Sequence, residues 1–187
     1  MNNEQFAEVI FEQIVEFIFN SNEIEGYSRH DYGKNSIHFK NHFNAFDYML
    51  KAFCSENLKN SENIILSTHG YLTKNLLHDK ESGFYRNCKV YVGNYTAPEI
   101  YMIKPLMEKL VVKILSAETE EDCWCIHDAF ETIHPFVDGN GRTGRCLLNA
   151  MLIKLDLSPV IIQADDRFVY YENINIWRKK NPNFLRV

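Results

Sequence analysis

Hydrophobic and polar positions alternate along this chain mainly with the period of a helix. Over residues 6–19, glutamates recur at every fourth position, and apolar side chains share another face: Phe6, Ile10, Ile14 and Phe17. This pattern predicts an amphipathic helix that packs on a core, because the glutamates interrupt any stretch able to cross a membrane. Helical spacing returns over residues 41–58, 61–78, 98–115, 120–133, 146–155 and 165–177.

The segment between the third and fourth of these helices has a different pattern. Glycines bracket residues 83–93, GFYRNCKVYVG, and Val90, Tyr91 and Val92 favour a strand, so a short β-hairpin is predicted there. Ser61 is suited to cap the helix that starts beside it. The chain is therefore expected to form one mostly α-helical domain over residues 1–187, with a small β-hairpin.

Length and composition narrow the class of protein. A length of 187 residues suits one domain. Hydrophobic residues make up 45% of the chain and charged residues 24%, a composition that excludes a disordered, collagen-like or membrane protein. The net charge of −5 disfavours nucleic acid as a partner, so any bound anion needs a local site.

The cysteines and the N-terminus bear on the compartment. The five cysteines are odd in number and lack the regular spacing of a disulfide framework, which indicates a reducing compartment. Cys123 and Cys125 are separated by one residue, whereas a zinc knuckle needs two. The opening MNNEQFAEV has no basic region or cleavage site, so a cytoplasmic location is expected.

One stretch, HPFVDGNGRTGR at residues 134–145, concentrates groups that handle phosphates. Its glycines, at 139, 141 and 144, let backbone N–H groups approach an anion, and the following helix adds the dipole of its N-terminus. Arg142 and Arg145 add two positive charges on one helix face. Asp138 suits Mg²⁺, and His134 suits a general base near neutral pH. Alone, each is an ordinary loop or helix residue; together they predict phosphoryl or nucleotidyl transfer. No Walker A or Rossmann pattern is present.

The same stretch resembles the signature HPF-x-[D/E]-GNGR-x-x-R of the Fic (filamentation-induced by cAMP) family at every specified position. The likeness extends over about residues 20–177, including GFYRNCKVYVG and SPVIIQADDRFVYYENI. It implies a Fic-type helical bundle with a β-hairpin flap.

The resemblance implies transfer of AMP from ATP to a Ser, Thr or Tyr hydroxyl of an unknown target protein, with release of pyrophosphate. His134 would then be the general base, Asp138 would hold Mg²⁺, and Arg145 would bind the γ-phosphate. The remaining nucleotide-binding residues implied are Gly139, Asn140, Gly141, Arg142 and, beside the adenine, Tyr171. The family often continues with an Asn one or two helical turns later, where this chain reads INIWRKK.

The flap would add a strand to an extended segment of the target protein. Residues Arg86, Val90 and Val92 fit such docking, and a plain edge hairpin is the alternative interpretation.

A second family pattern, [S/T]-x-x-x-E-[G/N], matches Ser21, Glu25 and Gly26, although Tyr27 stands where Asn is more usual. It implies an inhibitory helix over about residues 13–26. A carboxylate of Glu25 against Arg145 would neutralise the charge meant for the γ-phosphate and repel that phosphate. The same glutamate could position a water that removes AMP from a modified target.

Four alternatives stay open. They are a phosphotransferase of the Doc type, transfer of another nucleotide or phosphocholine, a nucleotide-binding scaffold without catalysis, and an interaction protein that uses its first helix. Oligomeric state is also open, since family members often associate as homo-oligomers.

Overall fold

Helices dominate the structure, a computed structural model that describes residues 3–55 and 58–186, with side chains described from residue 11 onward. The helices are α1 (Asn3–Ile24), α2 (Ile37–Cys54), α3 (Ser61–Thr73), α4 (Ile100–Leu115), α5 (Glu120–Ile133), α6 (Asn140–Lys154) and α7 (Arg167–Lys180). Two strands, β1 (Tyr91–Val92) and β2 (Tyr95–Thr96), form an antiparallel hairpin. The expected fold class, mostly α-helical with a small hairpin, is confirmed.

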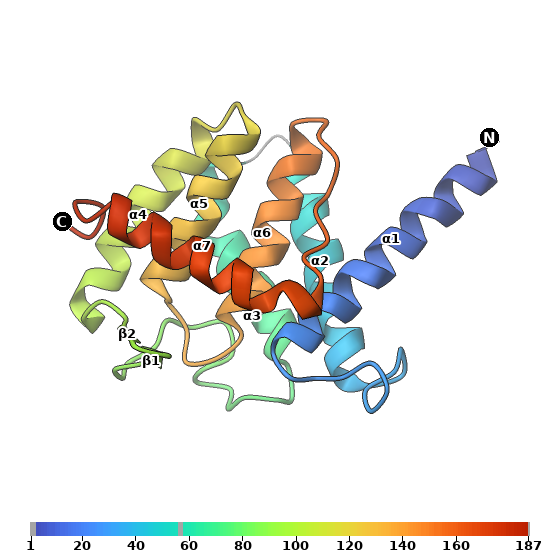
Figure 1. The fold of residues 1–187 in the computed structure, drawn as a ribbon, viewed down its shortest axis with the longest axis horizontal. Helices are drawn as coiled ribbons and strands as arrows, with labels where there is room; N and C mark the ends of the chain where they lie inside the picture. Colours follow the sequence, from blue (N-terminus) through green and yellow to red (C-terminus); the bar gives the residue numbers. More distant parts are fainter. Residues whose placement is uncertain (1–2, 56–57, 187) are drawn as a thin grey trace.

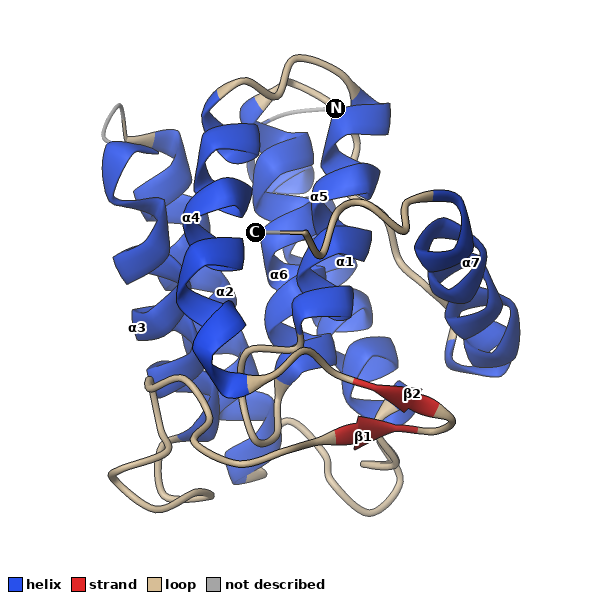
Figure 2. Ribbon diagram, turned by 90° about the vertical axis from the view of Figure 1, so that its left-hand side faces the viewer, coloured by secondary structure: helices blue, strands red, loops and turns tan. Residues whose placement is uncertain are grey.

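Helix α6 lies at the centre of the bundle, in contact with α1, α2, α3 and α5 (Figures 1 and 2). Nearly all of its side chains are buried, including two arginines, so it has no solvated face. The core around it is closed by large apolar side chains, among them Phe53, Phe130, Phe136, Ile18, Met49 and Leu106. Helix α7 crosses the bundle, and the N-terminal part of α1 extends away from the bundle (Figure 1).

Helix α1 carries part of the predicted amphipathic pattern. Phe17 is buried and Ile14 is half-buried, whereas Glu12 and Glu16 are exposed. The side chains of residues 6 and 10, which the same pattern assigned to the apolar face, lie outside the described residues. None of the described helices has the length and apolar character needed to cross a membrane.

Several predicted element boundaries are wrong. Helix α3 ends at Thr73 rather than at residue 78, because Asn75 takes a left-handed conformation (φ 59°) that breaks the helix. Helix α2 ends at Cys54 rather than at 58, and residues 56–57 lie outside the described part. Ser61 is the first residue of α3 rather than its cap, and its hydroxyl donates to the carbonyl of Leu58. Helix α6 begins at Asn140, six residues before the prediction, because its first turns bury polar side chains that hydrophobic spacing cannot detect.

The hairpin lies further along the chain than predicted. Its strands pair Tyr91 with Thr96 and Val92 with Tyr95 around a turn in which Gly93 has φ 57°. Residues 83–90 form a loop instead, although Val90 still accepts a backbone hydrogen bond from Ala97 N at 3.2 Å. The expected flap of 83–93 therefore corresponds to a loop followed by a hairpin over 91–96.

Candidate functional site

A cavity of about 660 Å³ opens where the end of α1, the hairpin, α5, α6 and α7 meet. The side chains and backbone that line it are those of Glu25, Val92, Gly93, Asn94, Tyr95, Glu131, His134, Gly141, Tyr171, Ile174, Asn175, Arg178 and Lys179. Several residues expected from the sequence to act together thus share one space: His134, Gly141, Tyr171 and Glu25.

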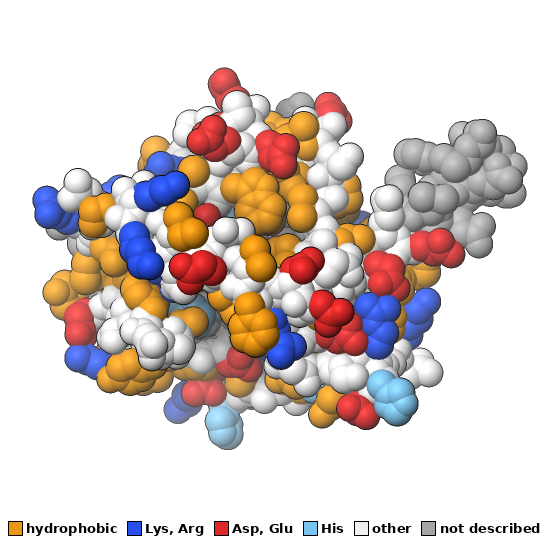
Figure 3. Space-filling model, viewed as in Figure 1, with side chains coloured by type: hydrophobic (Ala, Val, Ile, Leu, Met, Phe, Trp, Pro, Cys, Tyr) orange, Lys and Arg blue, Asp and Glu red, His pale blue; other side chains and the backbone are white. Residues whose placement is uncertain are grey.

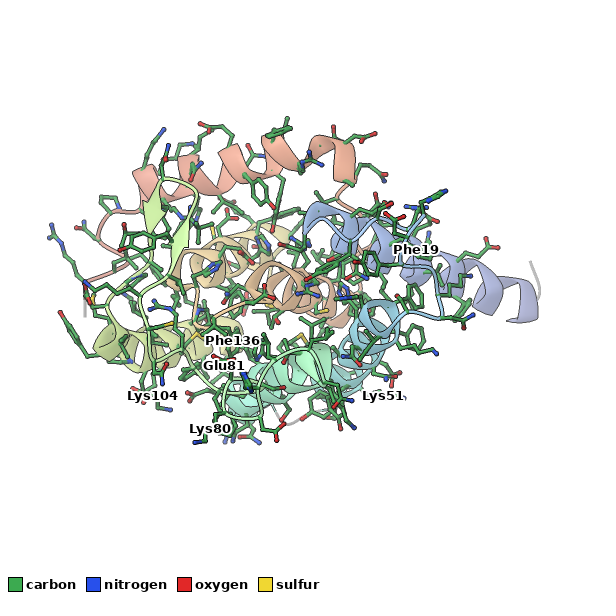
Figure 4. All side chains as sticks on the ribbon, turned by 90° about the horizontal axis from the view of Figure 1, so that it is seen from below. Phe19, Lys51, Lys80, Glu81, Lys104 and Phe136 are labelled. Atoms are coloured by element: carbon green, nitrogen blue, oxygen red, sulfur yellow. The ribbon has the colours of Figure 1, made fainter. Side chains whose placement is uncertain are left out.

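The loop between α5 and α6 is held rigidly from both sides. Phe136 is fully buried, and its ring stacks on His69 of α3 at 3.7 Å between centroids; Figure 4 shows it in the interior of the molecule. The Asn140 side chain clamps the same residue, since its Oδ1 accepts from Phe136 N and its Nδ2 donates to Phe136 O, both at 2.9 Å. In this structure, Asn140 shapes the loop rather than facing the cavity.

His134 ends α5 in a left-handed conformation, with φ 49° and ψ 62°, and this turns the chain into the loop. Burial, with smaller contributions from the nearby cations Arg178 and Arg86, lowers the pKa of its imidazole to about 4, although the backbone carbonyl of Glu131 acts in the opposite direction. The ring is therefore neutral at pH 7 and able to accept a proton. Its Nδ1 atom is buried and has no hydrogen-bond partner among the described residues.

Arg142 and Asp138 lie outside the cavity wall. The Arg142 guanidinium is 2% exposed, sits 5.0 Å from the ring centroid of Tyr27, and its Nη2 is 3.6 Å from Asp138 Oδ2. Its Nε and Nη1 have no partner among the described residues, which leaves donors for an anion. The Asp138 carboxylate is more than half exposed, and its Oδ1 accepts from Gly139 N at 2.7 Å. Gly139 packs on α3, and its backbone has a φ angle of 76°.

Arg145 and Glu25 form a short ion pair at the end of α1. Arg145 Nη2 is 2.7 Å from Glu25 Oε1, and Arg145 also donates from Nε to Ser21 Oγ and from Nη2 to Ser21 O, each at 2.8 Å. Burial opposes the charge on Arg145, but Tyr170, Glu25 and their neighbours more than compensate, so its pKa is raised and it stays a cation.

The Glu25 carboxylate lies directly over the first turn of α6. A Cβ at Gly141 would overlap with Glu25 Oε1, so only glycine leaves room for the carboxylate at this position. Gly26 follows with φ 89°, a conformation that ends α1 and favours glycine. A carboxylate from the chain's own helix thus occupies the anion-attracting N-terminus of α6.

Arg86 does not lie on a docking surface, so its predicted role in the flap is wrong. Its side chain is 3% exposed, and its guanidinium donates to the carbonyls of His134 (2.8 Å), Cys88 (2.9 Å) and Pro98 (2.6 Å). Arg86 therefore ties the loop before the hairpin to the start of the signature loop. Val92 lines the cavity and Val90 is half-buried, so only part of the predicted docking surface is exposed.

Comparison with known proteins shows which family this chain belongs to. The model of the Fic/DOC family matches residues 57–152, just over half of the chain, and covers α3, the hairpin, α4, α5 and most of α6. The chain belongs to the Fic/DOC family. Two relatives of this Fic chain are "Protein adenylyltransferase Fic" of Nematostella vectensis, 34% identical over 139 residues, and "Protein adenylyltransferase fic-1" of Caenorhabditis elegans, 35% identical over 101 residues.

These alignments cover 70% and 51% of this Fic chain, but only 33% and 20% of the two relatives. The chain thus spans a third or less of the relatives it matches. Two solved structures share its fold: a Fic domain-containing signaling protein from Bacteroides thetaiotaomicron (TM-score 0.74, 22% identity, 94% of this chain and 76% of that one) and Fic-1 from C. elegans (TM-score 0.73, 22% identity, 94% and 58%).

Three residues that line the cavity were not identified from the sequence. Asn175 lines the cavity one helical turn after Tyr171, and this i, i+4 spacing in INIWRKK was a signal that could have identified it. Glu131 and Arg178 also face the cavity, from α5 and α7, and no local spacing indicates their proximity. Arg178 Nε donates to Thr132 Oγ1 at 3.2 Å, so it joins α7 to α5 beside the cavity.

The described side chains form no metal-binding cluster. Within residues 11–55 and 58–186, no group of three or more His, Cys, Asp or Glu side chains could hold a metal ion. On the face drawn in Figure 3, acidic and basic side chains are interspersed rather than gathered into a basic stripe.

Proposed function

We propose that this chain transfers AMP from ATP to a hydroxyl group of a target protein, and that Glu25 inhibits the transfer. The relatives' names, protein adenylyltransferase, support the activity. The observation that carries the proposal is the pair formed by a neutral His134 in the cavity wall and a carboxylate seated on the N-terminus of α6 against Arg145.

The anion site would hold the triphosphate. The N-terminus of α6 offers backbone N–H groups and its dipole at Gly141, and Arg145 supplies a buried positive charge. Arg142, two of whose nitrogens lack partners among the described residues, would bind a further phosphate oxygen. Tyr171 and Asn175, on the α7 side of the cavity, would contact the adenine.

The transfer itself needs a base, and His134 fits that task. The neutral imidazole would take the proton of the target hydroxyl as its oxygen attacks the α-phosphorus. A new phosphorus–oxygen bond to the target forms, and the bond to the β-phosphate oxygen breaks, which releases pyrophosphate. The backbone of His134 is held by Arg86, so the ring is positioned before the substrate arrives.

Asp138 is the residue that would bind Mg²⁺ with the nucleotide. Its carboxylate is more than half exposed beside the start of α6, and a Mg²⁺ ion carried by phosphates commonly takes only one or two protein carboxylates. The bound ion would supply positive charge to the phosphates.

Inhibition would follow from the position of Glu25. Its carboxylate already neutralises Arg145 at 2.7 Å and fills the space over Gly141. A γ-phosphate at that place would meet a negative charge within a few ångströms, and the nucleotide would bind out of line for attack. Removing the carboxylate therefore should increase transfer.

The test incubates the chain with Mg²⁺ and ATP labelled at the α-phosphate, in the presence of cell lysate as a source of targets. Wild type, Glu25→Gly and Glu25→Gly/His134→Ala are compared, with γ-labelled ATP in parallel. Glu23→Gly is the matched control, because Glu23 lies on the same helix end but pairs with Arg29 rather than Arg145.

We expect weak labelling by wild type and by Glu23→Gly, strong labelling by Glu25→Gly from the α-label only, and none by the double variant. Transfer of the γ-label would instead identify a phosphotransferase. Equal labelling by Glu25→Gly and by the double variant would contradict the role of His134 as the base.

A further inference from the structure

Most of the hydrogen bonds that hold Arg145 come from the inhibitory helix itself. Among the described residues, three of its four bonds go to the end of α1 and the residue directly after it: one to each of two oxygens of Ser21 and one to Glu25. The fourth runs from Nη1 to the hydroxyl of Tyr170 on α7, at 3.4 Å. If α1 releases Arg145, Tyr170 is the one partner that remains among these four bonds.

Tyr170 belongs to a line of buried polar groups that ends at a carboxylate. Its hydroxyl is 3.0 Å from Nε2 of His127, and Nδ1 of His127 is 3.1 Å from Oδ1 of Asp128. His127 is fully buried and Tyr170 is 6% exposed, so water has little access to the bond between them, whereas the Asp128 side chain is 15% exposed. The line connects α6, α7 and α5 and involves no residue of α1.

The direction of each bond follows from what the groups can donate. The Asp128 carboxylate only accepts, so His127 carries its proton on Nδ1; the bare Nε2 then accepts from the hydroxyl of Tyr170. The tyrosine oxygen is thereby left to accept from the guanidinium, which only donates. A doubly protonated His127 would leave the Tyr170 hydroxyl hydrogen without a partner among the described residues. Burial raises the pKa of Tyr170, so its hydroxyl keeps that hydrogen.

A second carboxyl near Arg145 does not replace this line. Glu131 is 6% exposed, makes no side-chain hydrogen bond to Arg145 among the described residues, and its Oε1 has no partner there. Burial raises the pKa of Glu131, which favours its neutral form.

We infer that Asp128, His127 and Tyr170 are positioning residues that keep the Arg145 guanidinium in place behind Glu25, beside the cavity, after Glu25 leaves it. Their contribution is small while Glu25 pairs with Arg145. It becomes large once that carboxylate is gone, because Ser21 and Tyr170 are then the only partners left among these four bonds. The inference rests on the proposed function in one respect, that Arg145 binds the phosphates beyond the α-phosphate.

Calorimetric titration of Mg²⁺ with ATP, and separately of AMP, tests this dependence. In the Glu25→Gly background, Tyr170→Phe removes only the hydroxyl and should weaken ATP binding about tenfold, because a hydrogen bond to a charged group is lost. AMP, which lacks the outer phosphates, should bind unchanged. With Glu25 present, the same substitution should change ATP binding by less than about twofold, as coupling through a shared partner requires. Tyr101→Phe, at a side chain 77% exposed on α4, is the control.

Nitrogen-15 NMR of the His127 ring supplies a readout that needs no nucleotide. We expect a protonated Nδ1 and a bare Nε2 in wild type, and loss of this tautomer in Asp128→Ala but not in the control His30→Gln, at an exposed histidine. A protonated Nε2 in wild type would overturn the inference.

The two proposals can fail separately. Unchanged ATP binding by Tyr170→Phe in a Glu25→Gly variant that still transfers the α-label would refute the positioning role and leave the transferase intact. A tenfold loss of ATP binding with the expected tautomer, but no transfer of label by Glu25→Gly, would refute the transferase and support the positioning role.

Discussion

Two glycines inside helices of this protein should respond to alanine in opposite ways. Gly144 lies in α6 where it crosses α5, and a Cβ there would overlap with Glu131 Oε1 and lie 3.0 Å from Phe130 Cδ1. Gly70 lies in α3, and a Cβ there would meet only backbone atoms of Gly83 at 3.7 and 3.9 Å, which is ordinary contact. The first site has no room for a methyl group, and the second has enough.

The magnitudes follow from two opposing effects. Alanine in a helix interior stabilises by about 1 kcal/mol over glycine, and this gain applies at both sites. At Gly144 the methyl group also forces apart two helices whose contact is closed by the buried Phe130 and Glu131, and such overpacking costs about 3 kcal/mol. The free energy of unfolding should therefore fall by about 2 kcal/mol for Gly144→Ala and rise by up to about 1 kcal/mol for Gly70→Ala.

Thermal unfolding followed by circular dichroism measures both changes. For a chain of this length, about 2–4 °C in Tm corresponds to 1 kcal/mol, so we expect about 4–8 °C lower for Gly144→Ala and about 2–4 °C higher for Gly70→Ala. Urea unfolding at 25 °C gives the same comparison as a free energy. A Gly144→Ala protein as stable as wild type would refute the account of this helix crossing.

Three further predictions concern the cavity and its supports. In the folded protein the pKa values of His69 and His134 are lowered to about 4, so on acidification the unfolded chain takes up these protons at a higher pH than the folded chain does. The free energy of unfolding should therefore be highest above pH 6.5 and fall by about 3 kcal/mol per histidine as the pH drops toward 4. Equal urea midpoints at pH 7 and pH 5 would contradict this prediction. Tyr95→Phe removes the 2.9 Å bond to the Thr132 carbonyl and should cost about 1 kcal/mol, seen as faster amide exchange in the hairpin; exchange at the wild-type rate would refute the bond's role. Asn140→Ala leaves two buried backbone groups of the loop unpaired and should cost about 2–4 kcal/mol in urea unfolding, whereas a loss below about 1 kcal/mol would show that the loop holds its shape without the clamp.

The glycines of the signature loop illustrate how far a motif can be interpreted from sequence. All three were expected to let backbone N–H groups approach an anion. Gly141 agrees with that expectation, since only glycine leaves room for the Glu25 carboxylate at the helix start. Gly144 instead makes the α5–α6 crossing possible, and Gly139 packs on α3. The spacing of the glycines was visible in the chain, but which helix lies against each one was not.

Arg86 and Arg145 show the same limit for charged residues. Sequence patterns place arginines on solvated faces, yet both of these are buried and bind groups far away in the chain, Arg86 the carbonyl of His134 and Arg145 the hydroxyl of Ser21. The partner of Arg145 could be named only because a short pattern around Glu25 resembles a family motif. The Tyr170 contact, 25 residues away along the chain, had no such signal.

The sequence alone determined the features that depend on near neighbours in the chain. The period of apolar residues specified helices such as α5, and the glycines with His134 and Asp138 marked the loop, because backbone conformation and helix faces are set within a few residues. Tertiary structure decided which polar groups meet. The ion pair between Glu25 and Arg145 joins residues 120 positions apart, and its geometry depends on how α1 packs against α6. Burial then sets the charge state of His134, since desolvation is a property of the assembled fold and not of local sequence.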